Sequence, residues 1–218
     1  MLNSAIVVLA AAFLCGALYW EKKGSVRGNL LHKTAASALF IVAAGVQPVA
    51  VAPYTRWILV GLACCLGGDV LLAVPGRKAF LAGLVSFLLG HIMYGVAFFQ
   101  IVSPGPWFWA GLPPVVGVSA FTYYWLYPFL GSMRWPVLAY IVVISAMLTA
   151  AWSALGVAAV SPPGRLAIFI GALLFYVSDI FVARKRFLDP GFVNRLIGLP
   201  LYYAGQFLLA FSVGMVGQ

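Results

Sequence analysis

Two of the acidic side chains lie where a charge is costly. The chain of 218 residues has four of them, Glu21, Asp69, Asp179 and Asp189. Asp69 and Asp179 stand inside long apolar runs, and a carboxylate at the centre of a membrane helix costs about 2.5–3.5 kcal/mol on an insertion scale. Such groups either lock two helices together or serve a function in a polar cavity. We expect Glu21 and Asp189, which fall in connecting segments, to be solvated.

The two intramembrane carboxylates lie at matching depths. Asp69 is six residues before Pro75, which is about 9 Å along a helix. Asp179 is five residues before Arg184, which is about 7.5 Å. The two groups can therefore meet in one cavity just beneath the cytoplasmic headgroups. A carboxyl pair in such a place can perform general acid–base catalysis, with one group protonated and the other ionised.

Further polar side chains on the apolar runs reach nearby levels. They are Tyr140 at about 7.5 Å, Tyr202 and Tyr203 at about 10–12 Å, and His91 and Gln206 at about 16–20 Å, with Tyr94 on the same helix face as His91. Each has a structural interpretation as well as a functional one. A tyrosine near an interface is usually an anchor, and a lone buried His or Gln is usually a contact between helices.

Cations surround the cytoplasmic end of the helices that carry the aspartates. They are His32, Lys33, Arg77, Lys78, Arg184 and Arg186. Fixed cations pair well with phosphate, so this mouth is a candidate dock for a lipid headgroup. Membrane topology alone also explains much of this charge.

Membrane helices are the elements that must position these residues. The chain is 64% hydrophobic and 8% charged, against about 45–50% and about 25% in soluble domains. This excludes a soluble enzyme, a disulfide scaffold, a disordered chain and a coiled coil. We predict an all-α integral membrane protein, a bundle of about eight transmembrane helices in a single domain, residues 1–218. The expected spans are residues 2–20, 34–52, 55–74, 78–102, 106–130, 135–157, 165–184 and 195–216, the fifth kinked at Pro113 and Pro114.

The distribution of cations predicts the orientation. Of the 13 Lys and Arg residues, all but Arg56 and Arg165 flank the odd-numbered connections. By the positive-inside rule these connections are cytoplasmic, and both termini lie on the non-cytoplasmic side. The net charge of +9 therefore needs no nucleic acid to explain it. The compact chain with short connections is typical of a bacterial cytoplasmic membrane protein.

Similar segments surround the two aspartates. GDVLLA (residues 68–73) precedes RKAF, and SDIFVA (residues 178–183) precedes RKRF. This fits a parallel 4+4 repeat, a device found in membrane proteins.

Three kinds of function fit the carboxylate pair. The first is acid–base hydrolysis of a lipid, since the pair lies near a lipid-facing mouth. The second is a proton- or cation-coupled transporter, because intramembrane carboxylates also carry protons. The third is a metal-dependent lipid hydrolase using His32, His91, Asp69 and Asp179, although these have no short ligand spacing.

At these same residues the sequence resembles the YhhN-like lysoplasmalogenase family of eight-helix membrane proteins. The matching segments are LGGDVLL (66–72), FLLGHIMY (87–94), Ala139–Tyr140 with Met147, GALLFYVSD (171–179) and YYAGQ (202–206). In order and spacing they cover the chain from about Lys33 to its end. Lys33 is followed by Thr34, where the family usually has proline.

The resemblance implies hydrolysis of the vinyl ether bond of lysoplasmalogens, giving a fatty aldehyde and glycerophosphoethanolamine or glycerophosphocholine. It implies Asp69 and Asp179 as the catalytic pair. One donates a proton to the alkenyl carbon remote from oxygen, and the other stabilises the oxocarbenium ion and helps water to attack. The expected substrate-binding residues are Lys33, His91, Tyr94, Tyr140, Ser178, Tyr202, Tyr203 and Gln206. We expect a lysophospholipid substrate within membrane lipid, no cofactor, no metal and no obligate protein partner.

Overall fold

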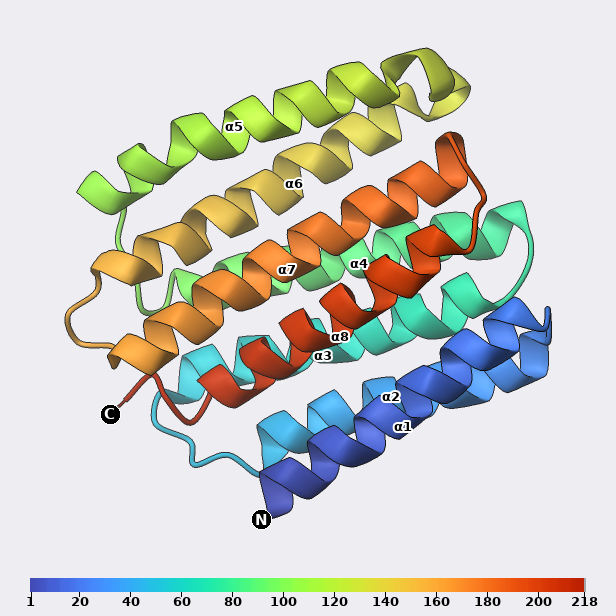
Figure 1. The fold of residues 1–218 in the computed structure, drawn as a ribbon. Coiled ribbons are helices and arrows are strands. Elements are labelled where there is room, and N and C mark those ends of the chain that lie inside the picture. The colour runs from blue at the N-terminus through green and yellow to red at the C-terminus, as the bar shows by residue number, and fades with distance from the viewer. Residues whose placement is uncertain (218) are drawn as a thin grey trace.

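The protein is a bundle of helices. The computed structural model describes residues 1–217, which form eight α-helices and three short 3-10 turns, with no strand among them. The helices are α1 (Leu2–Lys22), α2 (Val26–Gly45), α3 (Ala52–Ala73), α4 (Arg77–Phe98), α5 (Pro106–Leu126), α6 (Arg134–Ser153), α7 (Pro162–Phe187) and α8 (Val193–Ser212). The turns are η1 (Tyr127–Phe129), η2 (Gly131–Met133) and η3 (Ala154–Gly156). Figure 1 shows the helices running alongside one another. The predicted all-α architecture is confirmed.

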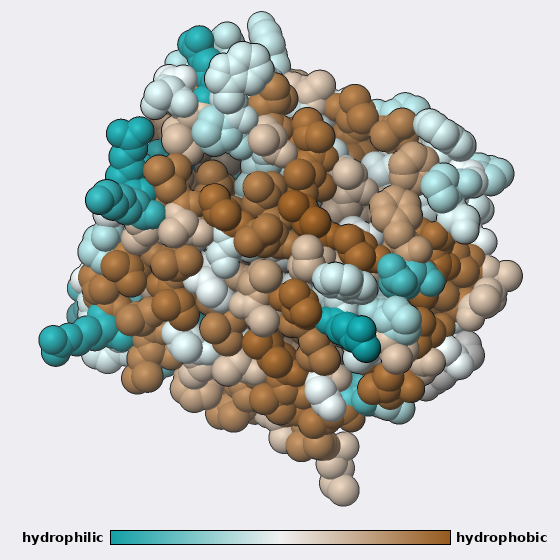
Figure 2. Space-filling model, turned by 180° about the vertical axis from the view of Figure 1, so that it is seen from behind, coloured by the Kyte–Doolittle hydropathy of each residue, from teal (hydrophilic) through white to brown (hydrophobic). Residues whose placement is uncertain are grey.

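The surface of the bundle suits a lipid bilayer. Five described segments are long and apolar enough to cross a membrane, namely Leu2–Lys22, Ala52–Ala73, Arg77–Phe98, Gly131–Gly156 and Pro162–Phe187. Large apolar side chains such as Leu9, Val85 and Val142 are exposed on them, and hydrophobic residues cover much of the face in Figure 2. The chain is therefore a multi-pass membrane protein. α2, α5 and α8, of 20, 21 and 20 residues, match the others in length but contain more polar, tryptophan or proline residues.

The second helix begins earlier than the hydropathy indicates. α2 starts at Val26 rather than at residue 34, because the Ser25 side chain caps it by accepting a hydrogen bond of 3.2 Å from the Gly28 amide. The preceding Gly24 has φ +71° and makes the turn from α1. This extension places Lys33 inside the helix, where it is buried, and not in a connecting segment as predicted.

The fifth helix lies at one edge of the bundle. α5 continues through Pro113 and Pro114 from Pro106 to Leu126. It packs mainly against α6 (Figure 1). Pro113 and Pro114 are both exposed on α5.

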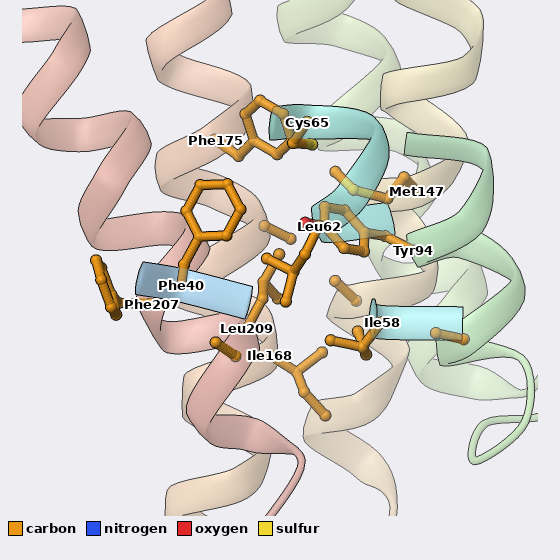
Figure 3. Packing of buried hydrophobic residues seen from close by; sticks show 14 of the residues in the cluster. Phe40, Ile58, Leu62, Cys65, Tyr94, Met147, Ile168, Phe175, Phe207 and Leu209 are labelled. Atoms are coloured by element: carbon orange, nitrogen blue, oxygen red, sulfur yellow. The ribbon is translucent and has the colours of Figure 1, made fainter. Parts of the chain in front are cut away.

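The core joins helices that are distant in the sequence. Figure 3 shows Phe40 of α2, Leu62 of α3, Tyr94 of α4, Phe175 of α7 and Leu209 of α8 among the side chains that pack together. The most extensive packing is between α3 and α4 and between α7 and α8. These two pairs carry the two aspartates.

Two glycines bring α7 and α8 into backbone contact. A Cβ at Gly205 would lie 2.7 Å from the Gly171 carbonyl oxygen, and a Cβ at Gly171 would lie 3.0 Å from the Gly205 carbonyl oxygen. Small residues allow this approach between membrane helices. The contact fixes the depth of α8 residues relative to Asp179 on α7.

Candidate active site

Both intramembrane aspartates line one apolar cavity, which we call the carboxylate cavity. It has a volume of about 100 Å³ and lies among α2 to α8. Its apolar wall includes Leu84, Phe87, Val137, Ile141 and Leu199. Its polar lining consists of Lys33, Asp69, Thr122, Tyr140, Tyr176, Ser178, Asp179, Lys185, Asn194, Arg195 and Tyr202. Asp69 and Asp179 thus line the same cavity, as their depths allowed.

Asp69 is enclosed by donors. The Lys33 Nζ is 3.0 Å from Asp69 Oδ1, and the two side chains are 3% and 2% exposed. Ser37 Oγ and Tyr202 OH each donate a hydrogen bond of 2.6 Å to Oδ2. The three side chains that contact this carboxyl are all donors, and one of them is a lysine ammonium.

Lys33 is therefore a partner of Asp69 and not a free cation at the mouth. Its backbone carbonyl accepts a hydrogen bond of 3.2 Å from Tyr203 OH, whose oxygen is also 3.0 Å from Ser37 Oγ. Lys33 and Ser37 are one helical turn apart on α2, so both side chains reach Asp69 from the same face. Tyr203 is thus hydrogen-bonded to two of the residues that contact Asp69.

Asp179 has a different environment. Its Oδ2 accepts a hydrogen bond of 2.7 Å from Tyr140 OH and lies 3.0 Å from His91 Nε2. Tyr140 OH is also 3.0 Å from His91 Nε2, so the three groups form a closed triangle. The Asp179 side chain is 16% exposed, which makes it the more accessible of the two aspartates.

The histidine beside Asp179 is buried against an aromatic ring. His91 is fully buried, with its ring centroid 4.3 Å from that of Phe175. Its Nδ1 has no hydrogen-bond partner within residues 1–217. Because a carboxylate oxygen accepts, the hydrogen on Nε2, assigned from this contact, is donated to Asp179.

Four of the predicted substrate-binding residues lie behind the cavity wall. His91, Tyr94, Tyr203 and Gln206 are not among its lining residues. Tyr94 OH donates to Gln206 Oε1, and Gln206 Nε2 is 3.6 Å from the sulfur of Cys65. These deep side chains link helices α3, α4 and α8. Lys33, Tyr140, Ser178 and Tyr202 do line the cavity.

A second cavity of about 350 Å³ adjoins the first, and we call it the vestibule. It is lined by Leu72, Val74, Pro75, Gly76, Phe80, Val182, Lys185, Arg186, Pro190 and Arg195. Lys185 and Arg195 line both cavities. The guanidinium of Arg186 lies 4.3 Å from the centroid of the Phe80 ring. The vestibule is therefore cationic, whereas the carboxylate cavity is mainly apolar.

Glu21 is paired and half-buried, so the prediction that it is solvated is wrong. Its Oε1 binds Lys185 Nζ and lies 3.3 Å from Arg195 Nε, while its Oε2 accepts a hydrogen bond of 3.0 Å from Asn29. This places a carboxylate of α1 against cations of α7 and α8. Asp189, by contrast, is exposed as predicted.

Sequence reasoning missed several residues of this region. Ser37, Tyr176, Lys185, Asn194 and Arg195 contact the aspartates or line the cavities. The spacing of Lys33 and Ser37 was a usable signal for a shared helix face. The other residues carried no such signal, because their positions depend on how distant helices pack.

His32, one of the four residues considered for a metal site, lies away from the carboxylate cavity. His32 Nδ1 donates to the Gly28 carbonyl at 2.8 Å, and its ring packs near Trp20 and Phe13. His32 does not line the carboxylate cavity. Within the described part of the chain, no three His, Cys, Asp or Glu side chains are grouped to hold a metal ion.

Comparisons with known proteins agree on one family. The model described as the YhhN family matches residues 28–213. Lysoplasmalogenase TMEM86A of Bos taurus is 32% identical over 187 residues, which is 80% of this chain and 72% of that protein. Lysoplasmalogenase TMEM86B of Rattus norvegicus is 36% identical over 170 residues, or 75% and 65% of the two chains. A lysoplasmalogenase of Mycobacterium bovis is 29% identical over 186 residues, or 79% and 64%. No solved structure matches the chain.

Proposed function

The chain belongs to the YhhN family, and we propose that it is a lysoplasmalogenase. The proposed reaction cleaves the vinyl ether bond of an alkenyl-glycerophosphoethanolamine or alkenyl-glycerophosphocholine to a fatty aldehyde and the glycerophospho-headgroup. Relatives about 30% identical over most of the chain bear that enzyme's name. The observation that carries the proposal is the pair of aspartates in one apolar cavity with unequal surroundings.

Asp179 is the general acid in this proposal. It is the more exposed carboxyl, and its contacts are the Tyr140 hydroxyl and the His91 imidazole, whereas Asp69 is against the Lys33 ammonium. The proposal therefore gives the acid role to the carboxyl that has no lysine or arginine beside it. Tyr140 and His91 both engage Oδ2, and no described residue donates a hydrogen bond to Oδ1. Oδ1 is thus the oxygen that can carry the proton to the alkenyl carbon remote from the ether oxygen.

Asp69 is the ionised partner. Lys33, Ser37 and Tyr202 hold its negative charge, so it does not compete with Asp179 for the proton. Protonation of the alkene gives an oxocarbenium ion, and the carboxylates beside it stabilise its charge. This is the division of roles that two unequal carboxyl groups provide in other acid–base enzymes.

Water completes the reaction. It adds to the oxocarbenium carbon and loses a proton to the Asp179 carboxylate, which restores the acid and leaves a neutral hemiacetal. The hemiacetal then breaks its bond to the glycerol oxygen, giving aldehyde and a glycerol hydroxyl. One water is consumed, and no net proton is gained or lost.

The membrane placement is also part of the proposal. Residues 1–218 form a single transmembrane domain with both termini on the non-cytoplasmic side, so the vestibule opens toward the cytoplasm. The cation distribution supports this orientation, and we place the protein in a bacterial cytoplasmic membrane. A 4+4 repeat is supported by the equivalent packing of α3 with α4 and of α7 with α8.

The test is hydrolysis by purified protein in detergent. A lysoplasmalogen, its saturated ether analogue and an acyl lysolipid are incubated separately, and fatty aldehyde and fatty acid are measured. We expect aldehyde from the vinyl ether alone. The reaction in D₂O should place one deuterium on the aldehyde carbon next to the carbonyl, because the proton comes from the exchangeable carboxyl.

The variants test the two aspartates. Removing a general acid or its partner typically lowers the rate about 10²–10⁴-fold, so Asp69→Asn and Asp179→Asn should each lose at least about 10²-fold in kcat. The exposed Asp189→Asn is the matched control. Release of fatty acid from the acyl lipid would mean that the enzyme cleaves an ester bond and not the vinyl ether bond. If the folded protein releases no product from any of the lipids, the proposed enzyme activity is refuted. Proton-coupled flux in liposomes would then test the alternative of a transporter.

A further inference from the structure

A buried acceptor at the start of α8 lacks a donor. Asn194 is 2% exposed and lines the carboxylate cavity. Its Nδ2 donates to the carbonyls of Asp189 and Gly191 at 2.7 and 3.2 Å, so Oδ1 is on the opposite side of the amide from these carbonyls. Oδ1 has no hydrogen-bond partner among residues 1–217. Since buried polar groups are nearly always paired, this oxygen requires a donor that the described chain does not supply.

The next residue offers the complementary group. Arg195 Nε is buried and makes no hydrogen bond within the described residues, although it lies 3.3 Å from Glu21 Oε1 as an ion pair. Lys185 binds the same Glu21 oxygen. Two cations against one carboxylate leave a net positive charge where the two cavities join. A guanidinium and an ammonium in this arrangement suit a phosphate.

The order of these groups matches the order of groups along a lysophospholipid. The carboxylate cavity contains Asp69 and Asp179 and is lined by Asn194. Lys185 and Arg195 follow at the junction with the vestibule. In an alkenyl lysophospholipid the ether is on the first glycerol carbon, a free hydroxyl is on the second and the phosphate is on the third. The hydroxyl is a donor between the bond to be cleaved and the phosphate.

We propose that Asn194, Arg195 and Lys185 form a subsite for the glycerophosphate of a lysophospholipid. Asn194 Oδ1 accepts a hydrogen bond from the free hydroxyl of the second glycerol carbon, and Arg195 and Lys185 bind the phosphate. The identity of the lipid rests on the proposed function. The subsite explains selection of a lyso lipid, because an esterified oxygen on that carbon has no hydrogen to donate and leaves Asn194 Oδ1 unpaired.

Binding of lipids that the proposed reaction does not cleave tests the subsite separately from the enzyme activity. The probes are a saturated 1-O-alkyl lysophosphoethanolamine, its 2-deoxy analogue and the corresponding 1-O-alkylglycerol. Titration calorimetry in detergent gives each Kd, corrected for partition into protein-free micelles. The wild type should bind the hydroxyl-bearing lipid about tenfold more tightly than the 2-deoxy analogue. It should also prefer the phospholipid to the alkylglycerol by about tenfold or more. Equal binding of the first pair overturns the role of Asn194, and equal binding of the second pair overturns the phosphate assignment.

Variants assign each preference to its residue. Asn194→Ala should abolish the preference for the hydroxyl, and Arg195→Gln should lower the preference for phosphate about tenfold while leaving the hydroxyl preference in place. Lys22→Gln, at an exposed cation outside both cavities, is the control and should change neither. Retention of the hydroxyl preference in Asn194→Ala, or of the phosphate preference in Arg195→Gln, contradicts the proposal.

Two further binding measurements distinguish the subsite from the α7–α8 connection and from a site for free diester. Asn194→Asp loses the donated bonds to the connection but keeps an acceptor, so it should keep the hydroxyl preference. A loss as large as in Asn194→Ala would assign the effect to the connection and overturn the proposal. Soluble glycerophosphoethanolamine should bind more weakly than the lipid, and equal affinity would show that the site takes the free diester instead. If no aldehyde is released yet these preferences hold, the proposed function fails and the subsite stands.

Discussion

The ion pair of Lys33 and Asp69 gives the sharpest prediction about stability. Both side chains are nearly inaccessible, with Nζ and Oδ1 3.0 Å apart. Replacing Lys33 by methionine keeps the length of the side chain and removes the charge. Breaking a buried ion pair by removing one partner costs about 3–5 kcal/mol, because the other charge is left without compensation. Ser37 and Tyr202 still donate to Asp69, so we expect Lys33→Met to lose about 3 kcal/mol, the lower end of that range.

The double variant separates the lost charge from lost packing. Asp69→Asn combined with Lys33→Met leaves no buried charge at this place, and it should be more stable than Lys33→Met alone. The free energy of unfolding is measured by titration with a denaturing detergent, in a double-mutant cycle over the four proteins. Both variants should be inactive, since Asp69 is altered or left without its cation.

The result of this cycle can refute the reasoning in two ways. Lys33→Met that is as stable as the wild type would mean that the lysine does not compensate a buried charge. A double variant no more stable than Lys33→Met would mean that the loss came from packing. Full activity of Lys33→Met would remove Asp69 from the chemistry as an ionised group.

Two further substitutions test the acid and the helix contact. Tyr140→Phe removes the hydroxyl that donates to Asp179 at 2.7 Å and should lower kcat about tenfold. The control is Tyr176→Phe, because Tyr176 lines the same cavity but its hydroxyl is bonded to Ser119 at 2.8 Å. It should keep the wild-type kcat, and equal losses in the two variants would contradict the role of Tyr140. Gly205→Ala puts a methyl 2.7 Å from a carbonyl of α7 and should reduce the free energy of unfolding by about 1–3 kcal/mol. Gly117→Ala in open space should be neutral or stabilising by about 0.5–1 kcal/mol, and similar stability of the two variants would refute the close contact.

The sequence predicted the number of helices and the shared cavity of the aspartates for a clear physical reason. Apolar runs of about 20 residues must cross the bilayer as helices, and depth within a helix follows from counting residues. Asp69 and Asp179 could therefore be placed at one level without any knowledge of the packing.

The partners of those aspartates could not be predicted in the same way. Lys33 looks like a residue of a connecting segment by hydropathy, and only the cap at Ser25 extends α2 to include it. Glu21 meets Lys185 and Arg195 because α1 packs near α8. Such contacts depend on the order of helices around the bundle, which periodicity along one helix does not contain.

The two helix pairs have a consequence for how a lipid reaches the carboxylates. Asp69 belongs to the α3–α4 pair and Asp179 to the α7–α8 pair, in which Gly171 and Gly205 hold the backbones together. Tyr202 of α8 donates to Asp69, and His91 of α4 contacts Asp179, so each carboxyl group is bonded to a helix of the other pair. In the proposed reaction, a lipid whose entry separated the two pairs would break both contacts, and the carboxyl groups would regain them only once the pairs had closed around the alkyl chain.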